Sequence, residues 1–304
     1  MLMKRVAVAG LGAMGWPMAE NLDQAGLEVL ALDALSERAD AFHRQASGHK
    51  AAIDSVEALV IMVVNAAQIR ALLFSDVLVA GGLVSQLPAD ACIVQMSTVA
   101  PADAAALAAE VAAVRPDLHY VDAPVSGGVV GAKAGTLSIM AAGEAPSLAR
   151  CHVLFDILGQ AIFEVGDRPG QGAAMKAVNQ LLCGVHIAAA AEALALAEKS
   201  GIDRQVALEL VQGSAASSWM LRDRGPRMVA PPGEVTSAID IFCKDLGIVC
   251  DAAGSSRAYT PLAHSAHQLF VATAEGGEGR LDDSQLIRTY RRLNGCDPEG
   301  GTQA

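Results

Sequence analysis

The chain has few aromatic residues and few positive charges for its size. Aromatic residues make up 4% of its 304 residues, and 22 lysines and arginines face 33 aspartates and glutamates, a formal net charge of −11. The low aromatic content disfavours an aromatic-rich β-sandwich and favours close-packed helices, since alanine supplies much of the apolar content. The shortage of positive charge argues against nucleic-acid partners and anionic membrane surfaces, which need basic patches.

The cysteines also lack the spacing of a metal site or of a redox-active pair. They stand at positions 92, 151, 183, 243, 250 and 296, with no CxxC pair and no histidine at ligand spacing. His264 and His267 could share a helix face, but two histidines without a third ligand make a weak zinc site. We therefore expect reduced thiols in a cytoplasmic protein and no bound metal.

Targeting and membrane-spanning segments are not expected either. The strand expected at Val6–Ala9 begins too close to the amino end to leave room for a signal peptide. The most apolar later stretch, Leu181–Ala197, contains His186 and Glu192. We expect it to fall short of a membrane span, and we expect no membrane partner.

The first half of the chain alternates short β-branched runs with helical segments, which predicts an α/β domain with a doubly wound parallel sheet of the Rossmann type. The expected strands are 6–9, 28–33, 59–65, 92–98, 119–125, 137–142 and 161–165, and the expected helices are 14–25, 36–46, 66–73, 101–114 and 146–158. From Gly170 onward the pattern is helical only. The sequence therefore predicts a dinucleotide-binding domain over residues 1–168 and an all-α domain over 169–304, divided near Asp167–Gly170.

A glycine-rich turn links the first expected strand to the first expected helix. It has the GxGxxG pattern of a dinucleotide-binding loop, in which the first glycine permits a tight turn, the second admits the pyrophosphate and the third lets helix pack on strand. The helix N-terminus adds partial positive charge, which an anionic ligand needs in this acidic chain. The expected cofactor-binding residues of the loop are Gly10, Leu11, Gly12, Ala13, Met14 and Gly15.

An acidic residue, Asp33, ends the second expected strand, 18 residues after Gly15. A carboxylate there can accept both ribose hydroxyls and repel a 2′-phosphate, which predicts NAD as the cofactor rather than NADP. Two alternatives remain at this point. Asp33 could instead cap the helix near Ser36, and Arg38 could soften the preference for NAD, although we expect Arg38 to face solvent.

Two further motifs carry candidate substrate-binding groups. In Asp122–Gly128 (DAPVSGG), the Ser126 hydroxyl and the exposed backbone of two glycines, at the carboxyl end of a strand, could hold a carboxylate. In Gly172–Asn179 (GAAMKAVN), Lys176 and Asn179 share one helix face with the glycine. A lone helical lysine is ordinarily a solvated surface residue, but Lys176 stands in an apolar stretch.

Taken in order, the glycine loop, DAPVSGG, GxxxKxxxN and Lys244–Gly247 (KDLG) resemble the signatures of the β-hydroxyacid dehydrogenase family, which includes 3-hydroxyisobutyrate dehydrogenase. The resemblance covers essentially the whole chain. It implies a Rossmann domain, an all-helical domain through which subunits pair as a homodimer or homotetramer, and an active site in the cleft between the lobes. It also implies Lys176 as the catalytic acid/base, Asn179 as a substrate-orienting residue, and Ser126, Gly127 and Gly128 on the substrate carboxylate. Asn65, Thr98 and Lys244 would line the cofactor.

The substrate is implied less sharply than the reaction class. The stretches Val63–Gln68, Ser217–Met220 and Asp282–Ser284 are similar to the L-threonate dehydrogenase branch, which oxidises the 2-hydroxyl of a four-carbon sugar acid. Polar side chains at Ser217, Ser218 and Asn65 would suit such a polyol.

An ordinary lysine is protonated at neutral pH, so Lys176 would need an apolar site and nearby positive charge to serve as a base.

Several alternatives stay open. Tartronate semialdehyde (2-hydroxy-3-oxopropionate) reductase shares every motif quoted, and 3-hydroxyisobutyrate dehydrogenase shares the architecture. An imine reductase has the same architecture but lacks the lysine at position 176. A dinucleotide-binding scaffold without catalysis would have no use for the serine, lysine and asparagine together.

Overall fold

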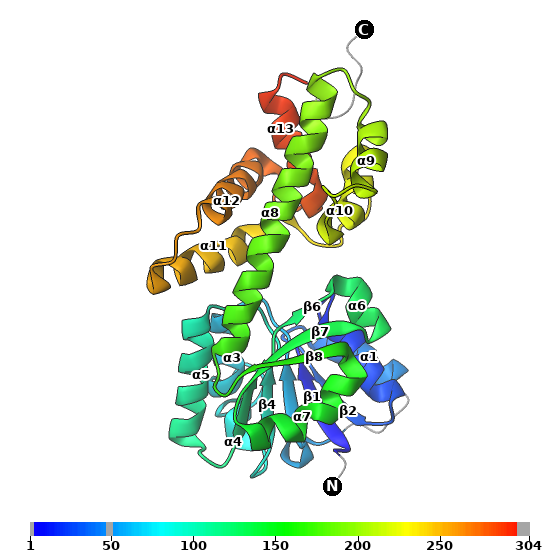
Figure 1. Ribbon diagram of the computed structural model, residues 1–304. Helices are drawn as coiled ribbons and strands as arrows, with labels where there is room; N and C mark the ends of the chain where they lie inside the picture. Colours follow the sequence, from blue (N-terminus) through cyan, green and yellow to red (C-terminus); the bar gives the residue numbers. More distant parts are fainter. Residues whose placement is uncertain (1–2, 47–50, 297–304) are drawn as a thin grey trace. The chain divides into compact units, whose positions relative to one another are not determined.

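The computed structural model describes residues 3–46 and 51–296. The chain divides into two compact units, Met1–Lys176 and Ala177–Ala304. This division falls inside one long helix, α8 (Gln171–Lys199), whereas the boundary expected from the sequence lies just before that helix. Figure 1 shows the first unit as a sheet covered by helices and the second as helices alone.

Within residues 3–46 and 51–176, the first unit contains eight strands in one sheet. The strands are β1 (Arg5–Ala9), β2 (Glu28–Leu32), β3 (Ala58–Ile61), β4 (Cys92–Gln95), β5 (His119–Asp122), β6 (Val125–Ser126), β7 (Leu137–Ala142) and β8 (Gly159–Gly166). Their order is β2-β1-β3-β4-β5-β7-β6, with β8 also paired to β7. The helical segments are α1 (Gly15–Gln24), α2 (Ser36–Gln45), the 3₁₀ turn η1 (Ile53–Ser55), α3 (Ala66–Phe74), α4 (Gly82–Gln86), α5 (Pro101–Val114), α6 (Gly128–Ala134) and α7 (Ala145–Leu158).

Alternate residues of the central strands point to opposite faces of the sheet and pack in two separate apolar cores. Val6 and Val8 of β1 pack in one core with residues of α1 and α7, while Ala7 and Ala9 pack in the other with residues of α3, α4 and α5. Because both faces are covered, these strands read as continuous apolar runs. The predicted α/β fold class is confirmed by this doubly wound arrangement.

The sheet is mixed rather than wholly parallel. β1 to β5 pair in parallel, but β7 runs antiparallel to β5 and β6. The pairs Asp122–Ala142, Val125–Ile139 and Ser126–Ser138 share one register, so β5 and β6 are one strand interrupted at Pro124. Proline has no N–H to donate to a ladder, which accounts for the interruption. The Pro124 carbonyl still accepts from the Met140 N–H at 3.0 Å.

The second unit is built from helices around one apolar core. Beyond α8 it contains α9 (Arg204–Gln212), α10 (Trp219–Val229), α11 (Ile239–Ser256), α12 (Pro261–Thr273), the π-helical segment η2 (Ala274–Glu278), the 3₁₀ turn η3 (Asp283–Leu286) and α13 (Ile287–Leu293). Phe242 of α11 and Phe270 of α12 stack with their ring centroids 5.1 Å apart. Their core also takes in Ile187 and Ala191 of α8.

Helix α8 is long and apolar enough to cross a membrane. It has 29 residues and contains an 18-residue window of mean hydropathy 1.6. Length and composition alone therefore do not separate this stretch from a span. One such helix is weak evidence for a membrane, because the core helix of a soluble protein passes the same test, and 44% of the window is buried inside the structure.

Candidate active site

The glycine loop has the geometry that its sequence pattern predicts. Gly10 has φ +97°, and a Cβ there would lie 2.3 Å from the Met62 carbonyl oxygen, while a Cβ on Gly15 would lie 1.8 Å from the Gly10 oxygen. Neither position admits a side chain. A Cβ on Gly12 would meet nothing within 4 Å, so this glycine leaves open space at the mouth of the turn, as the approach of a pyrophosphate requires.

Asp33, just past the end of β2, is tied to the glycine loop. Its Oδ2 accepts the Leu11 N–H at 2.7 Å and its Oδ1 accepts the Leu35 N–H at 2.9 Å. The N-cap of α2 is Leu35 and has no side-chain cap. Asp33 therefore braces the loop and the turn before α2 rather than capping that helix directly. Arg38 lies 3.9 Å from the same carboxylate, with its side chain half exposed, which differs from the expectation that it faces only solvent.

A cavity of about 320 Å³ lies beside these groups. It is lined by Gly10, Gly12, Asp33–Leu35, Arg38, Met62–Val64, Gln68, Ala71, Leu72 and Val77. Its lining joins apolar side chains, which suit a nucleobase, with the Asp33 carboxylate and two glycines of the loop. The residues present thus fit the adenosine half of a nicotinamide dinucleotide.

The other expected cofactor residues of the first unit follow β3 and β4 at the carboxyl edge of the sheet. Asn65 is the N-cap of α3, where its side chain accepts the Gln68 N–H at 2.9 Å. Thr98 follows Ser97, a buried residue whose hydroxyl accepts the Val63 N–H at 2.9 Å and so ties the two loops together. Ser97 could not be predicted, because nothing in the sequence distinguishes it from any other serine after a strand.

The DAPVSGG segment places Ser126 in β6 and begins α6 at Gly128. Gly127 has φ +132° and Gly128 has φ +61°, backbone conformations that L side chains rarely adopt. Both glycines are exposed, and Ser126 is half-buried. The chain therefore presents a hydroxyl and glycine backbone together at this end of the sheet, as expected for a carboxylate-binding turn.

Lys176 lies in the first turns of α8 and is only 6% exposed. A buried lysine is uncommon, because burial disfavours the ammonium form, so the surface interpretation of Lys176 does not hold. The start of α8 is held by Asp122, whose Oδ2 accepts the N–H groups of Gly170 at 2.8 Å and Ala173 at 2.9 Å. Burial raises the pKa of the Asp122 carboxyl to about 6, although these N–H groups favour its charged form.

In the second unit, Asn179 and Lys244 are connected by a network of hydrogen bonds and an ion pair. The Asn179 amide donates to Gln180 Oε1 at 2.9 Å, the Gln180 amide donates to Asp245, and the Lys244 ammonium lies 3.0 Å from Asp245. Gln180 and Asp245 are buried. The structure thus brings Asn179 and Lys244, from two separate motifs, into one network. The sequence carries no signal that marks Gln180, and Asp245 is visible there only as part of the KDLG motif.

The polar residues of the two later stretches that resemble the L-threonate dehydrogenase branch, Ser217–Met220 and Asp282–Ser284, have local structural roles. Ser218 is the N-cap of α10, where its hydroxyl accepts the Leu221 N–H at 3.0 Å, and Ser217 accepts from the Arg222 guanidinium at 2.8 Å. Asp283 is buried in a bidentate ion pair with Arg224. These contacts hold α10 and η3, so they lend no independent support to a particular substrate.

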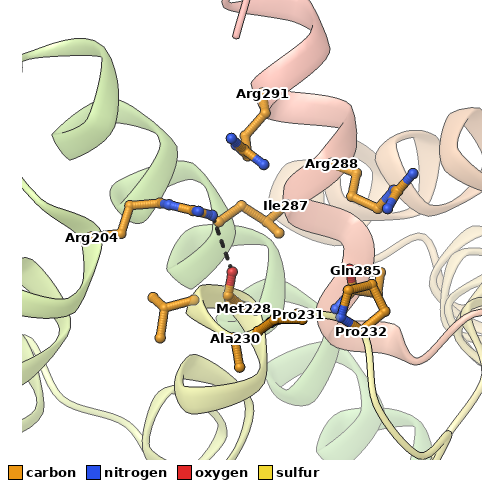
Figure 2. A pocket seen from close by; sticks show the side chains of 10 residues that line it. Arg204, Met228, Ala230, Pro231, Pro232, Gln285, Ile287, Arg288 and Arg291 are labelled. Atoms are coloured by element: carbon orange, nitrogen blue, oxygen red, sulfur yellow. Dashed lines mark hydrogen bonds between the residues drawn. The ribbon is translucent and has the colours of Figure 1, made fainter. Parts of the chain in front are cut away.

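A second cavity, of about 180 Å³, lies within the helical unit (Figure 2). Its charged lining is Arg204, Arg288 and Arg291, and the Arg204 guanidinium donates to the Met228 carbonyl at 3.3 Å. Arg291 pairs with Glu198 and Arg288 with Glu278, so most of this positive charge is already compensated. None of the residues expected to bind cofactor or substrate lines this cavity.

Comparison with known proteins identifies the family. Residues 5–166 match the NAD-binding domain of 6-phosphogluconate dehydrogenase, and residues 170–290 match the NAD-binding domain of NADP-dependent 3-hydroxyisobutyrate dehydrogenase. L-Threonate dehydrogenase of Escherichia coli K12 is 36% identical over 94% of each chain, and that of Cupriavidus necator is 38% identical over 94% of this chain and 96% of the relative. The crystal structure of 3-hydroxyisobutyrate dehydrogenase from Salmonella typhimurium has 37% identity and a TM-score of 0.83, covering 94% of this chain and 99% of that one.

Relatives with 32–34% identity are dehydrogenases named for other substrates. They are 2-(hydroxymethyl)glutarate dehydrogenase of Eubacterium barkeri at 33%, 3-hydroxyisobutyrate dehydrogenase of Pseudomonas aeruginosa at 34%, and NAD-dependent L-serine dehydrogenase of the same organism at 32%. Imine reductases share the fold, with TM-scores of 0.57 to 0.60 at 14–21% identity.

These matches and the site define an NAD(P)-dependent oxidoreductase of hydroxy acids. The chain belongs to the β-hydroxyacid dehydrogenase family, the 3-hydroxyisobutyrate dehydrogenase-like group that its motifs resemble. The predicted family, enzyme class and dinucleotide cofactor are thereby confirmed. The roles of individual residues, the oligomeric state and the precise domain boundary stay predictions.

Proposed function

We propose that this enzyme oxidises L-threonate at its 2-hydroxyl to 2-oxo-tetronate, with NAD as the hydride acceptor. The observation that carries the proposal is the agreement of five L-threonate dehydrogenases at 36–38% identity, against 32–34% for relatives of other names.

The preference for NAD rests on Asp33. Its two oxygens accept two backbone N–H groups, which leaves lone pairs on both for the hydroxyls of an adenosine ribose. Its charge opposes a 2′-phosphate, whereas Arg38, lining the same cavity, would favour one. We propose that Asp33 dominates because it is held rigidly from two sides while half of the Arg38 side chain is exposed.

The proposed chemistry assigns one task to each residue. The Ser126 hydroxyl and the backbone of Gly127 and Gly128 hold the substrate carboxylate, and Asn179 orients the substrate. Lys176 takes the proton of the 2-hydroxyl at its Nζ, which requires a neutral amine, and its burial favours that form. The hydride that leaves the carbinol carbon would pass to bound NAD, which is the chemistry that the cofactor would supply. In the reverse direction the Lys176 ammonium returns the proton.

The remaining assigned residues serve the dinucleotide. We propose that the glycine loop from Gly10 to Gly15 holds the pyrophosphate, with Asn65, Thr98 and Lys244 contacting the rest of the cofactor. Lys244 is held beside Asp245, so its ammonium has a fixed position from which to meet an anionic or polarised group.

The test is NADH formation at 340 nm with a panel of hydroxy acids. The panel contains L-threonate, 3-hydroxyisobutyrate, L-serine and 2-(hydroxymethyl)glutarate, and 2-hydroxy-3-oxopropionate is assayed in the reductive direction. We expect the highest kcat/KM with L-threonate. A higher value with another member would reassign the substrate within the class. No turnover of any member, despite measured NADH binding, would favour a dinucleotide-binding scaffold.

A further inference from the structure

The strongest unassigned feature is the buried carboxylate of Asp122. This residue ends β5, is 0% exposed and lies 48 residues before Gly170 in the sequence. Its Oδ2 accepts two backbone N–H groups from the beginning of α8, those of Gly170 and Ala173. Its Oδ1 is buried and has no hydrogen-bond partner within residues 3–46 and 51–296.

Such a carboxylate is costly, because a buried charge with an unpaired oxygen loses hydration that it does not regain. The beginning of α8 explains why a carboxylate is buried here. The residue before the helix is Gly170, which has φ +98°, and a Cβ there would lie 2.9 Å from the Pro101 carbonyl oxygen. The chain therefore has no side chain at this position to cap the helix. Asp122 satisfies the orphan N–H groups from a distant strand, and its charge suits the helix dipole.

The same turn of α8 lies directly on the sheet. A Cβ on Gly172 would be 2.5 Å from the Asp122 carbonyl oxygen and 2.6 Å from the Met140 oxygen. Lys176 is one turn beyond Ala173, so its place follows from where this first turn is fixed. Asp122 also belongs to the interrupted strand that carries Ser126, since both pair with β7 in one register.

We propose that Asp122 is a positioning residue: by accepting the N–H groups of Gly170 and Ala173, its carboxylate fixes the first turn of α8 and thereby the position of Lys176 relative to Ser126. The inference rests on the proposed role of Lys176 in proton transfer. Asp122 itself touches neither substrate nor cofactor in this scheme.

The test compares Asp122→Ala with two matched variants. Asp122→Asn keeps an oxygen that can accept both N–H groups. Glu57→Ala is the control, because Glu57 Oε2 also accepts two backbone N–H groups, from Lys4 and Arg5, but at the opposite edge of the sheet. Each variant is assayed with L-threonate, or with whichever panel member the wild type turns over best. NADH binding and amide hydrogen exchange of residues 170–176 are measured on the same preparations.

For Asp122→Ala we expect kcat to fall about 10–100-fold, as for a misplaced catalytic group. The KM for NAD should stay unchanged and amide exchange at 170–176 should rise. Asp122→Asn should restore both kcat and slow exchange, and Glu57→Ala should alter neither. If Asp122→Ala does not fold, Gly172→Ala perturbs the same contact by pushing α8 off the sheet, and the same loss of kcat with unchanged NAD binding is expected.

Two results would overturn the proposal. One is wild-type kcat in Asp122→Ala or Gly172→Ala together with fast exchange at 170–176. The other is an Asp122→Asn variant as impaired as Asp122→Ala. Failure of the proposed function is distinguishable, because an active Lys176→Ala enzyme would refute the role of Lys176 whatever the Asp122 variants do.

Discussion

Replacing Asp122 by asparagine should remove a pH-dependent loss of stability from the first unit. The carboxyl has a pKa of about 6 in the folded protein against 3.8 for an unperturbed aspartate. Since one pKa unit corresponds to about 1.4 kcal/mol, ionisation of Asp122 costs the fold about 3 kcal/mol once the pH exceeds the folded value. Asparagine carries no charge and escapes this cost.

The sign follows from proton binding. Between pH 3.8 and about 6 the folded state holds a proton on Asp122 that the unfolded state has lost, so stability falls as the pH rises through this window. Roughly half of the 3 kcal/mol should be lost by about pH 5 and nearly all of it by about pH 7. The advantage of Asp122→Asn over wild type should grow in step. Any penalty from the unpaired amide nitrogen does not depend on pH. It would therefore change the difference in unfolding free energy between the two proteins by a constant.

The chain offers a convenient probe for this experiment. It has two tryptophans, Trp16 in the first unit and Trp219 in the second. Trp219 is 58% exposed, so a Trp219→Phe background leaves Trp16, packed edge-on against Phe42, to report on the first unit. Urea unfolding followed by Trp16 fluorescence from pH 5 to 8 gives the free energies of both proteins. A difference that does not change with pH would refute the reasoning about Asp122.

Three further predictions concern the proposed catalytic and binding residues. Lys176→Ala should lower kcat by about 10²–10⁴-fold without loss of NAD binding, and Lys176→Arg should fail nearly as badly, since a guanidinium cannot release its proton; an active arginine variant would make Lys176 a carboxylate clamp instead. Ser126→Ala should cost roughly 1.5–3 kcal/mol of transition-state binding and raise the KM for the hydroxy acid; a change in NAD affinity alone would reassign the DAPVSGG loop to the cofactor. Because of Asp33, kcat/KM at equal concentrations should be higher with NAD than with NADP, and equal values would show that Arg38 governs the pocket.

Much of the first unit could be predicted because its signal is local. The apolar runs of β1 and β3, buried on both faces, and the glycine loop between strand and helix are visible in the sequence itself. The ends of the strands were predicted less accurately from the sequence. The strand expected to reach Thr98 ends at Gln95, and the one expected to reach Asn65 ends at Ile61, because the residues beyond form loops at the carboxyl edge of the sheet.

What the sequence could not predict depends on contacts between distant residues. The antiparallel direction of β7 follows from the connection through α6, which the alternating pattern does not reveal, and α4 and α6 are too short to show a helical period. The hydrogen bonds of Asp122 join residues about 50 positions apart, and the link from Gln180 to Asp245 spans 65. Sequence motifs point to the residues that meet ligands, but not to those that hold them in place.

The bond from the Leu11 N–H to Asp33 bears on any attempt to redirect the enzyme toward NADP. Replacing the acidic residue is the obvious first step, but Asp33 also holds the glycine loop through this 2.7 Å contact. Asp33→Ala would therefore loosen the loop that both cofactors need, and it would weaken NAD and NADP alike. Asp33→Ser or Asp33→Asn keeps an acceptor for Leu11 while removing the charge, which leaves Arg38 free to meet the additional phosphate. A redesign of cofactor choice in this protein should begin from those two substitutions.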